Sequence, residues 1–86
     1  MPRGDIEKAN EGYVLRVLAG TRDGAGTKEV RYRVNNLLGK EQVRRRLTEA
    51  QALEVLESLT SQGKAAKQST DPVTWLITPR GRGFLQ

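Results

Sequence analysis

The chain has 86 residues, contains neither cysteine nor histidine, and carries a formal net charge of +5 at pH 7. This length predicts one small domain with a thin core, and the missing side chains exclude disulfides, zinc sites and histidine-based catalysis. We therefore expect a binding protein rather than an enzyme, with no catalytic residues, no cofactor and no metal.

Apolar residues recur at helical spacing after Gly4-Asp5, which predicts a first helix over about residues 5–19. The stretch GTRDGAGT that follows is rich in glycine and predicts a loop that ends at Thr27, a candidate N-cap. This loop lacks the Gly-Lys-Ser/Thr ending of a phosphate-binding loop, so we expect no nucleotide site there.

The segment KEVRYRVNNLLG is compatible with two structures. Its apolar residues alternate with arginines from Val30 to Val34, as they would in a strand. The apolar pattern continues through Leu38 at helical spacing, and we favour a helix over about residues 28–38. In the strand alternative, the segment would form a hairpin with YVLRVLAG.

The stretch GKEQVRRRLTEAQ decides how many helices follow. At about 100° per residue, the apolar residues before Thr48 cluster in a direction roughly opposite to those after it. TEAQ also has the form of a capping box between Thr48 and Gln51. We therefore predict a short basic helix over about residues 40–46 and a second helix over about 49–62, which ends at Gly63. One longer helix through both segments is the alternative.

Two short strands are predicted further along the chain, at about residues 64–69 and 73–78, with a turn at Asp71-Pro72 between them. We expect Trp75 to anchor this hairpin in the core rather than to stack on a base. The closing RGRGFLQ is expected to be a flexible end.

The charge is distributed unevenly along the chain. Residues 28–46 carry seven basic and two acidic side chains, a net charge of +5, whereas residues 47–63 carry three acidic side chains and no basic one, a net charge of −3. Residues 64–86 carry four basic and one acidic side chain, a net charge of +3. Such concentration creates a local field that can hold a polyanion, and nucleic acid is the expected class of partner.

Nothing in the chain suggests a membrane or secretory destination. No apolar run approaches the ~20 residues needed to span a bilayer. The polar stretch MPRGDIEKAN lacks the apolar run of a signal peptide. We expect a cytoplasmic protein that makes no membrane contact.

The adjacent Arg44, Arg45 and Arg46 are the strongest candidates for contact with nucleic acid. On a helix they would fan through about 200°, so at least two would reach a phosphate backbone or a groove. The planar guanidinium can clamp a phosphate or read the edge of a guanine. The alternative is a solvated basic face that pairs with Glu41 or Glu49.

The order of elements is similar to a winged helix-turn-helix, and the pattern LTEAQALEVLESLTSQGKAAKQ…VTWLITPRGRGFL resembles transcriptional regulators of the MarR and PadR type. The positions that match these families are Leu56, Leu59, Gly63 and Ala65 before the wing, and Ile77, Thr78 and Gly81 after it. LLGKEQVRRRL resembles the turn and the start of the recognition helix in many winged helices, with Gly39 in the turn and Val43 and Leu47 pointing inward. The resemblance covers about residues 27–85. It implies an α+β winged helix, with three to four helices followed by a two-stranded β-hairpin wing, that binds double-stranded DNA to regulate transcription.

The sequence departs from those families in two places. Their recognition helix runs straight to the wing, whereas here Arg46 and Gly63 lie 17 positions apart and the residues between them are largely acidic or apolar. No long dimerisation helix follows the wing, so a homodimer would have to use the first helix.

The expected DNA interface places the arginine run in or beside the major groove, with phosphate contacts from the preceding helix and the wing. It comprises Arg44, Arg45, Arg46, Lys40, Gln42, Arg31, Arg33, Lys64, Lys67, Arg80 and Arg82. A protein–protein module that uses the Glu49, Glu54 and Glu57 face or the Leu37-Leu38 corner is the second hypothesis. RNA or general nucleoid binding is the third.

Overall fold

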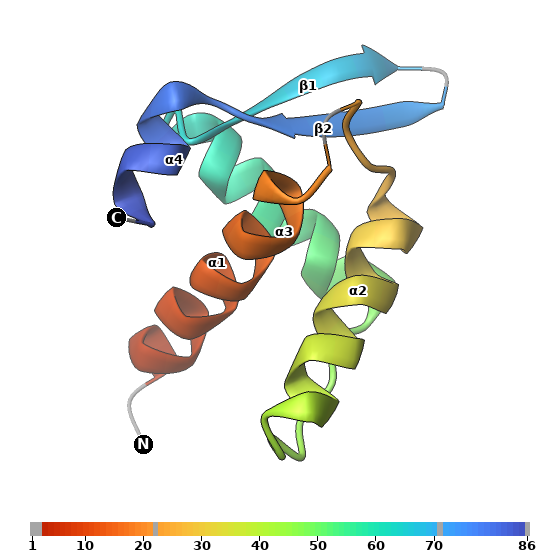
Figure 1. Cartoon of the computed structure of the whole chain (residues 1–86), viewed down its shortest axis with the longest axis vertical. Coiled ribbons are helices and arrows are strands. Elements are labelled where there is room, and N and C mark those ends of the chain that lie inside the picture. Colours follow the sequence, from red (N-terminus) through yellow and green to blue (C-terminus); the bar gives the residue numbers. More distant parts are fainter. Residues whose placement is uncertain (1–2, 22, 71, 86) are drawn as a thin grey trace.

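The computed structural model describes residues 3–21, 23–70 and 72–85, and the side chains of residues 8–21, 23–68 and 72–85. The elements in chain order are α1 (Arg3–Ala19), α2 (Thr27–Lys40), α3 (Glu49–Ser61), β1 (Ala65–Thr70), β2 (Val73–Ile77) and α4 (Pro79–Phe84). The first three helices pack together, and the antiparallel hairpin lies across one end of them (Figure 1). The fold is therefore α+β, and its order of three helices and a hairpin is consistent with a winged helix.

The helix predicted over 28–38 is confirmed, and the strand alternative is excluded. Val30, Val34 and Leu38 form a fully buried stripe at a spacing of four residues. The predicted N-cap is wrong, because α2 begins at Thr27 with Gly26 as its N-cap. The Thr27 hydroxyl instead accepts a hydrogen bond of 3.2 Å from Nε1 of Trp75, since a buried indole N–H needs an acceptor.

The helix predicted over 40–46 is wrong. α2 continues past Gly39 to Lys40, and residues 43–48 then form a segment without regular secondary structure. The same segment excludes the alternative of one long helix. Arg44, Arg45 and Arg46 therefore lie in a loop between α2 and α3, which we call the arginine loop (residues 41–48).

A left-handed residue ends α2 and explains why the helix cannot continue. Gln42 has a φ of 61°. Its N–H donates to the carbonyl oxygen of Gly39 at 3.1 Å, and the N–H of Val43 donates to that of Leu38 at 2.9 Å. This is a Schellman motif, and it reverses the chain so that Val43 packs against the core.

The far end of the arginine loop is held by side-chain hydrogen bonds. The side-chain amide of Asn35 donates to the Leu47 carbonyl oxygen at 3.0 Å, and its Oδ1 accepts from the Leu47 N–H at 2.8 Å. Leu47 is buried, as its inward position in the sequence predicted. The capping box is confirmed by hydrogen bonds of 3.1 and 2.9 Å between Thr48 and Gln51.

α3 buries Ala52, Leu56 and Leu59, and its end is also confirmed. Gly63 has a φ of 75° and its N–H donates to the Thr60 carbonyl oxygen at 3.0 Å. The next N–H, that of Lys64, donates to Leu59 at 2.9 Å, which completes a second Schellman motif.

Trp75 joins the hairpin to the helices. Its side chain is 1% exposed, and its backbone makes two hydrogen bonds with Ala25, of 2.9 and 3.0 Å, in an isolated β-bridge. On its other edge β2 pairs with β1, where Lys67 lies opposite Trp75 and the register shifts at Gln68. The core role predicted for Trp75 is confirmed, whereas Asp71 of the predicted turn lies outside the described residues.

The hydrophobic core lies between the three helices and the inner face of the hairpin. Its largest fully buried side chains are Trp75, Leu15, Leu18, Leu38, Leu56, Leu59, Val14, Val30 and Val34. Val73 and Ile77, which alternate with their neighbours on the same face of β2 as Trp75, are partly buried against this core.

The flexible end predicted for RGRGFLQ is wrong, because most of it forms α4. The Thr78 hydroxyl accepts from the Gly81 N–H at 3.1 Å and donates to the Gly63 carbonyl oxygen at 2.6 Å. Pro79 occupies the first turn, where its missing N–H costs nothing. Gly81 is buried so close to the Lys64 carbonyl oxygen that a Cβ there would collide with it.

Candidate nucleic-acid interface

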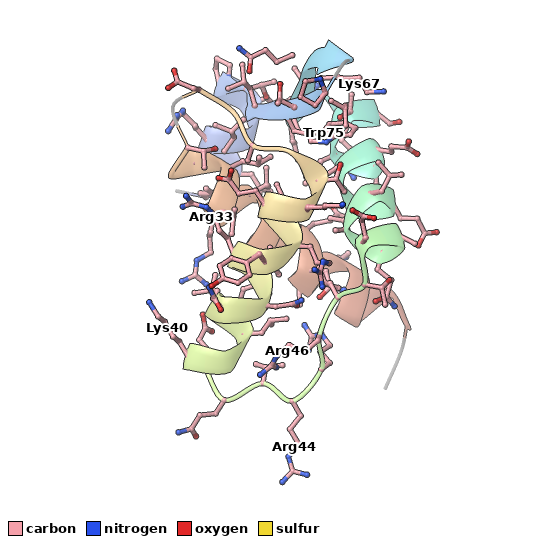
Figure 2. The ribbon with its side chains drawn as sticks, turned by 90° about the vertical axis from the view of Figure 1, so that its right-hand side faces the viewer. Arg33, Lys40, Arg44, Arg46, Lys67 and Trp75 are labelled. Carbon is pink, nitrogen blue, oxygen red and sulfur yellow. The ribbon has the colours of Figure 1, made fainter. Side chains whose placement is uncertain are left out.

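The three adjacent arginines have three different surroundings. Arg44 is exposed at the tip of the arginine loop, where no hydrogen bond or ion pair to the described part of the chain holds it (Figure 2). Arg45 is half-buried, and its Nε and Nη2 donate to Oδ1 of Asn10 at 3.3 and 3.2 Å. Arg46 donates to the carbonyl oxygens of Val43 and Arg45. Arg45 and Arg46 thus brace the loop, whereas the charge of Arg44 is available to a partner.

The two arginines of α2 do not form one patch. At about 100° per residue, Arg31 and Arg33 point about 200° apart around the helix. Arg31 is half-buried on the flank that also carries Asn35, which faces the arginine loop. Arg33 lies on the flank that faces α1 and forms an ion pair of 3.0 Å with Glu29.

A groove of about 420 Å³ runs between α1 and α2. It is lined by Arg16, Val17, Gly20, Arg33, Asn36, Leu37 and Lys40. Three of these side chains are cationic, and they come from both walls. Figure 2 shows Arg33 and Lys40 projecting from the same side of α2. We call this feature the α1–α2 groove.

The end of the groove carries a small polar network. Glu41 accepts a hydrogen bond of 3.0 Å from the Tyr13 hydroxyl and one of 3.3 Å from Nη1 of Arg16, an ion pair as well. The hydrogen bond to Glu41 raises the pKa of Tyr13, partial desolvation and the Glu41 charge raise it further, and Arg45 and Arg16 oppose these effects. The Tyr13 hydroxyl thus holds the Glu41 carboxylate beside Arg16.

The cations of the wing and α4 gather at the other end of the molecule. Lys64 Nζ lies 4.0 Å from the centroid of the Phe84 ring, and Lys67 Nζ lies 5.2 Å from that of Trp75. Figure 2 shows Lys67 and Arg44 near opposite ends of the longest dimension, which spans 33 Å.

The residues predicted for the DNA interface therefore divide into two groups. The loop end holds Lys40, Gln42, Arg44, Arg45 and Arg46, and the wing end holds Lys64, Lys67, Arg80 and Arg82, while Arg31 and Arg33 lie on α2 between them. Lys67 and Arg44, one from each group, lie near opposite ends of the molecule.

α3 presents an acidic outer face. Glu49, Glu54 and Glu57 are exposed on this helix, whose sequence EAQALEVLESLTS contains no basic residue. Since Ala52 and Leu56 point into the core, Glu54 and Glu57 point away from it. In Figure 2, α3 lies on the opposite side of the molecule from Arg33 and Lys40. The acidic and basic surfaces thus face in different directions.

Three residues of the basic surface were not predicted from the sequence. Arg16 and Asn36 line the groove, and Tyr32 is 64% exposed on α2. Tyr32 could have been found, because it lies about 200° around the helix from Val30 and so opposite the buried stripe. Arg16 could not, because the spacing of α1 alone does not say which helix lies beside it.

The described residues offer neither a metal site nor a membrane span. Their Asp and Glu side chains form no group of three that could hold a metal ion. No helix among them is long and apolar enough to cross a bilayer.

Comparison with known proteins adds no relative to this picture. No family model matches the chain, no curated protein matches it, and no solved structure matches it. The candidate interface consequently rests on the fold and on the placement of its charged side chains.

Proposed function

We propose that this domain binds double-stranded DNA, and that it does so through the basic surface of α2 and the arginine loop rather than through α3. One observation carries this proposal: Arg33 and Lys40 lie on the side of the molecule opposite to α3, whose outer face is acidic, and Arg44 lies exposed at the end of the molecule (Figure 2). DNA bound at the basic side meets Lys40 and Arg44 while the glutamates point away from its phosphates.

The acidic face argues against the docking most common for this type of fold. In helix-turn-helix domains the second helix of the pair enters the major groove. Here that helix is α3, and its entry would bring Glu54 and Glu57 close to the phosphates. Like charges at this distance repel, so the exposed Arg44 and the end of α2 are the better candidates for the groove or its rim.

The winged-helix-like order and the MarR/PadR-type sequence pattern support a role as a small transcriptional regulator. This role needs binding and no catalysis. A homodimer would double the basic surface and match a DNA site with two-fold symmetry. Selection of bound duplexes from a random pool tests both points, since a palindromic consensus is expected from a sequence-specific dimer.

The proposal is tested by fluorescence anisotropy with a labelled duplex at about 50 and 200 mM salt. We expect binding at low salt that weakens steeply as salt rises, because phosphate contacts release counterions. A competition with single-stranded RNA and random duplex distinguishes DNA regulation from general nucleic-acid binding. No binding at low salt would sink the proposal.

A second function is favoured by the α3 face. Leu53 is 37% exposed there, beside the exposed Glu49, Glu54 and Glu57. An apolar side chain surrounded by carboxylates suits a partner protein with a basic, partly apolar surface. Reversing charges on α2 and the arginine loop should abolish DNA binding but leave such a protein contact intact.

A further inference from the structure

The α1–α2 groove brings together cations that the sequence keeps apart. Arg16 comes from α1, and Arg33 and Lys40 come from α2, two turns of one helix face apart. The groove also holds Asn36, whose side chain can donate, and it has no carboxylate among its lining residues. The groove has a volume of about 420 Å³ and is open to solvent.

We propose that this groove binds a phosphate group, and that in the DNA complex the group is a backbone phosphate of the duplex. The phosphate source, though not the site itself, rests on the function proposed above. Cationic donors on both walls match the several oxygens of a phosphate, and a guanidinium can hold two of them at once.

The existing ion pairs of the two arginines leave the site open to an anion. Arg16 pairs with Glu41 at 3.3 Å and Arg33 with Glu29 at 3.0 Å, and both arginine side chains remain about half exposed. Exposed pairs of this kind contribute little to stability, so a phosphate can compete for the same guanidinium groups. Lys40 has no ion pair to any described residue and supplies an uncompensated charge.

Two apolar side chains, Val17 and Leu37, complete the lining of the groove between the cationic side chains. The groove is also open to the surface along two helices, so a phosphate that belongs to a long chain can enter it. It lies on the same side of α2 as Lys40 and is therefore continuous with the surface proposed for DNA.

The test uses backbone amide NMR spectra of the full chain, titrated separately with inorganic phosphate and with a duplex. We expect saturable shifts centred on Gly20 and Asn36 with both probes. Arg16→Gln should weaken phosphate binding several-fold and lower the salt slope of duplex binding by about 1. Arg16→Lys should restore part of both effects, and the matched control Arg82→Gln on α4 should leave the phosphate titration unchanged.

Each outcome decides between the two proposals. Duplex binding with no shift at Gly20 or Asn36, and with a salt slope that Arg16→Gln does not change, overturns the groove site and leaves DNA binding standing. Saturable phosphate binding without any duplex binding overturns the proposed function and its phosphate source but keeps the site. Weak, unsaturated shifts spread over all cationic residues overturn the site, because they indicate a general ionic atmosphere. A thermal melt of each variant verifies that it is folded.

Discussion

α2 with its arginine loop and α3 are built alike on the inside and differ on the outside. They have 14 and 13 residues, each buries three apolar side chains on one stripe, and each ends in a Schellman motif. The outer side of α2 and its loop is basic, whereas that of α3 is acidic. The inner stripe determines where a helix packs, while the outer face determines what the helix can meet. In this domain the inner stripes are alike, and the charge of the outer face alone distinguishes α2 and its loop from α3.

We expect the largest effect on DNA binding from reversing charges on α2 and the arginine loop. Lys40→Glu combined with Arg44→Glu should weaken duplex binding roughly 100-fold at low salt, because two phosphate contacts become repulsive. The matched control Glu54→Lys with Glu57→Lys reverses two charges on α3 and should not weaken binding. Anisotropy titrations measure both variants. Loss of binding in the α3 variant alone would place the DNA on the other side of the molecule.

The next effect concerns how the arginine loop is held. Asn35→Ala removes both hydrogen bonds to Leu47 and should lower the free energy of unfolding by about 2 kcal/mol. Asn35→Asp keeps the acceptor for the Leu47 N–H but places a carboxylate oxygen against the Leu47 carbonyl oxygen, so it should also destabilise the fold. Urea unfolding measures the loss. A change of less than about 0.5 kcal/mol for the alanine variant would contradict the role of Asn35 as the loop's anchor.

The two helix ends should respond in opposite directions. Gln42 occupies a left-handed conformation that glycine adopts without strain, so Gln42→Gly should stabilise the fold by about 0.5–1 kcal/mol. Gly63→Ala places a Cβ in the same conformation and should cost about 1 kcal/mol. Thermal unfolding of both variants compares the ends directly, and the same sign for both would contradict the shared motif.

The start of α3 is stabilised by hydrogen bonds between Thr48 and Gln51, which lie within one helical turn, whereas the loop before it is held by Asn35 of the preceding helix. Thr48→Ala removes the side-chain acceptor of the capping box and should cost about 0.5–1 kcal/mol. Thr48→Ser retains the hydroxyl and serves as the control, since it should restore most of the stability. Helical content and urea midpoints report the difference, and equal losses in the two variants would rule out the hydroxyl as the cause.

The smallest expected effect is a shift in the pKa of Tyr13. The pKa of Tyr13 lies above its ordinary value of 10.0, chiefly because its hydroxyl donates to Glu41. A raised folded pKa stabilises the protein below the unfolded value, and this contribution is lost as pH rises through the folded value. Ultraviolet titration of the phenolate should show Glu41→Gln moving the Tyr13 pKa down. An unchanged titration would mean that this hydrogen bond does not form in solution.

Sequence signals succeeded where the decisive interactions were local. The capping box at Thr48 and the glycine at Gly63 both lie within one helical turn of the groups that they cap. The predicted end of α2 was wrong because Gly39, a residue type that often ends helices, lies inside this helix. Gln42 instead takes the left-handed position that favours glycine.

Two other predictions failed because of contacts with residues far along the chain. Thr78-Pro79 is a helix-start signal, yet α4 also needs Gly81 to approach the Lys64 backbone, a contact with the preceding turn. Thr27 is a good N-cap by type, but the buried Trp75 indole uses its hydroxyl. Partners far along the chain compete with local rules, and the local pattern does not show them.

Three features could be predicted from the sequence, because periodicity and charge are local properties of a chain. They are the order of the main helices and strands, the buried stripe of α2 and the separation of basic from acidic segments. The folded structure was needed to show that Arg45 and Arg46 brace a loop while Arg44 stays available. It also decided that Arg16 lies across a groove from Arg33 and Lys40. The physical reason is that a helical pattern specifies which side of a helix is buried, whereas packing decides which other helix that side meets.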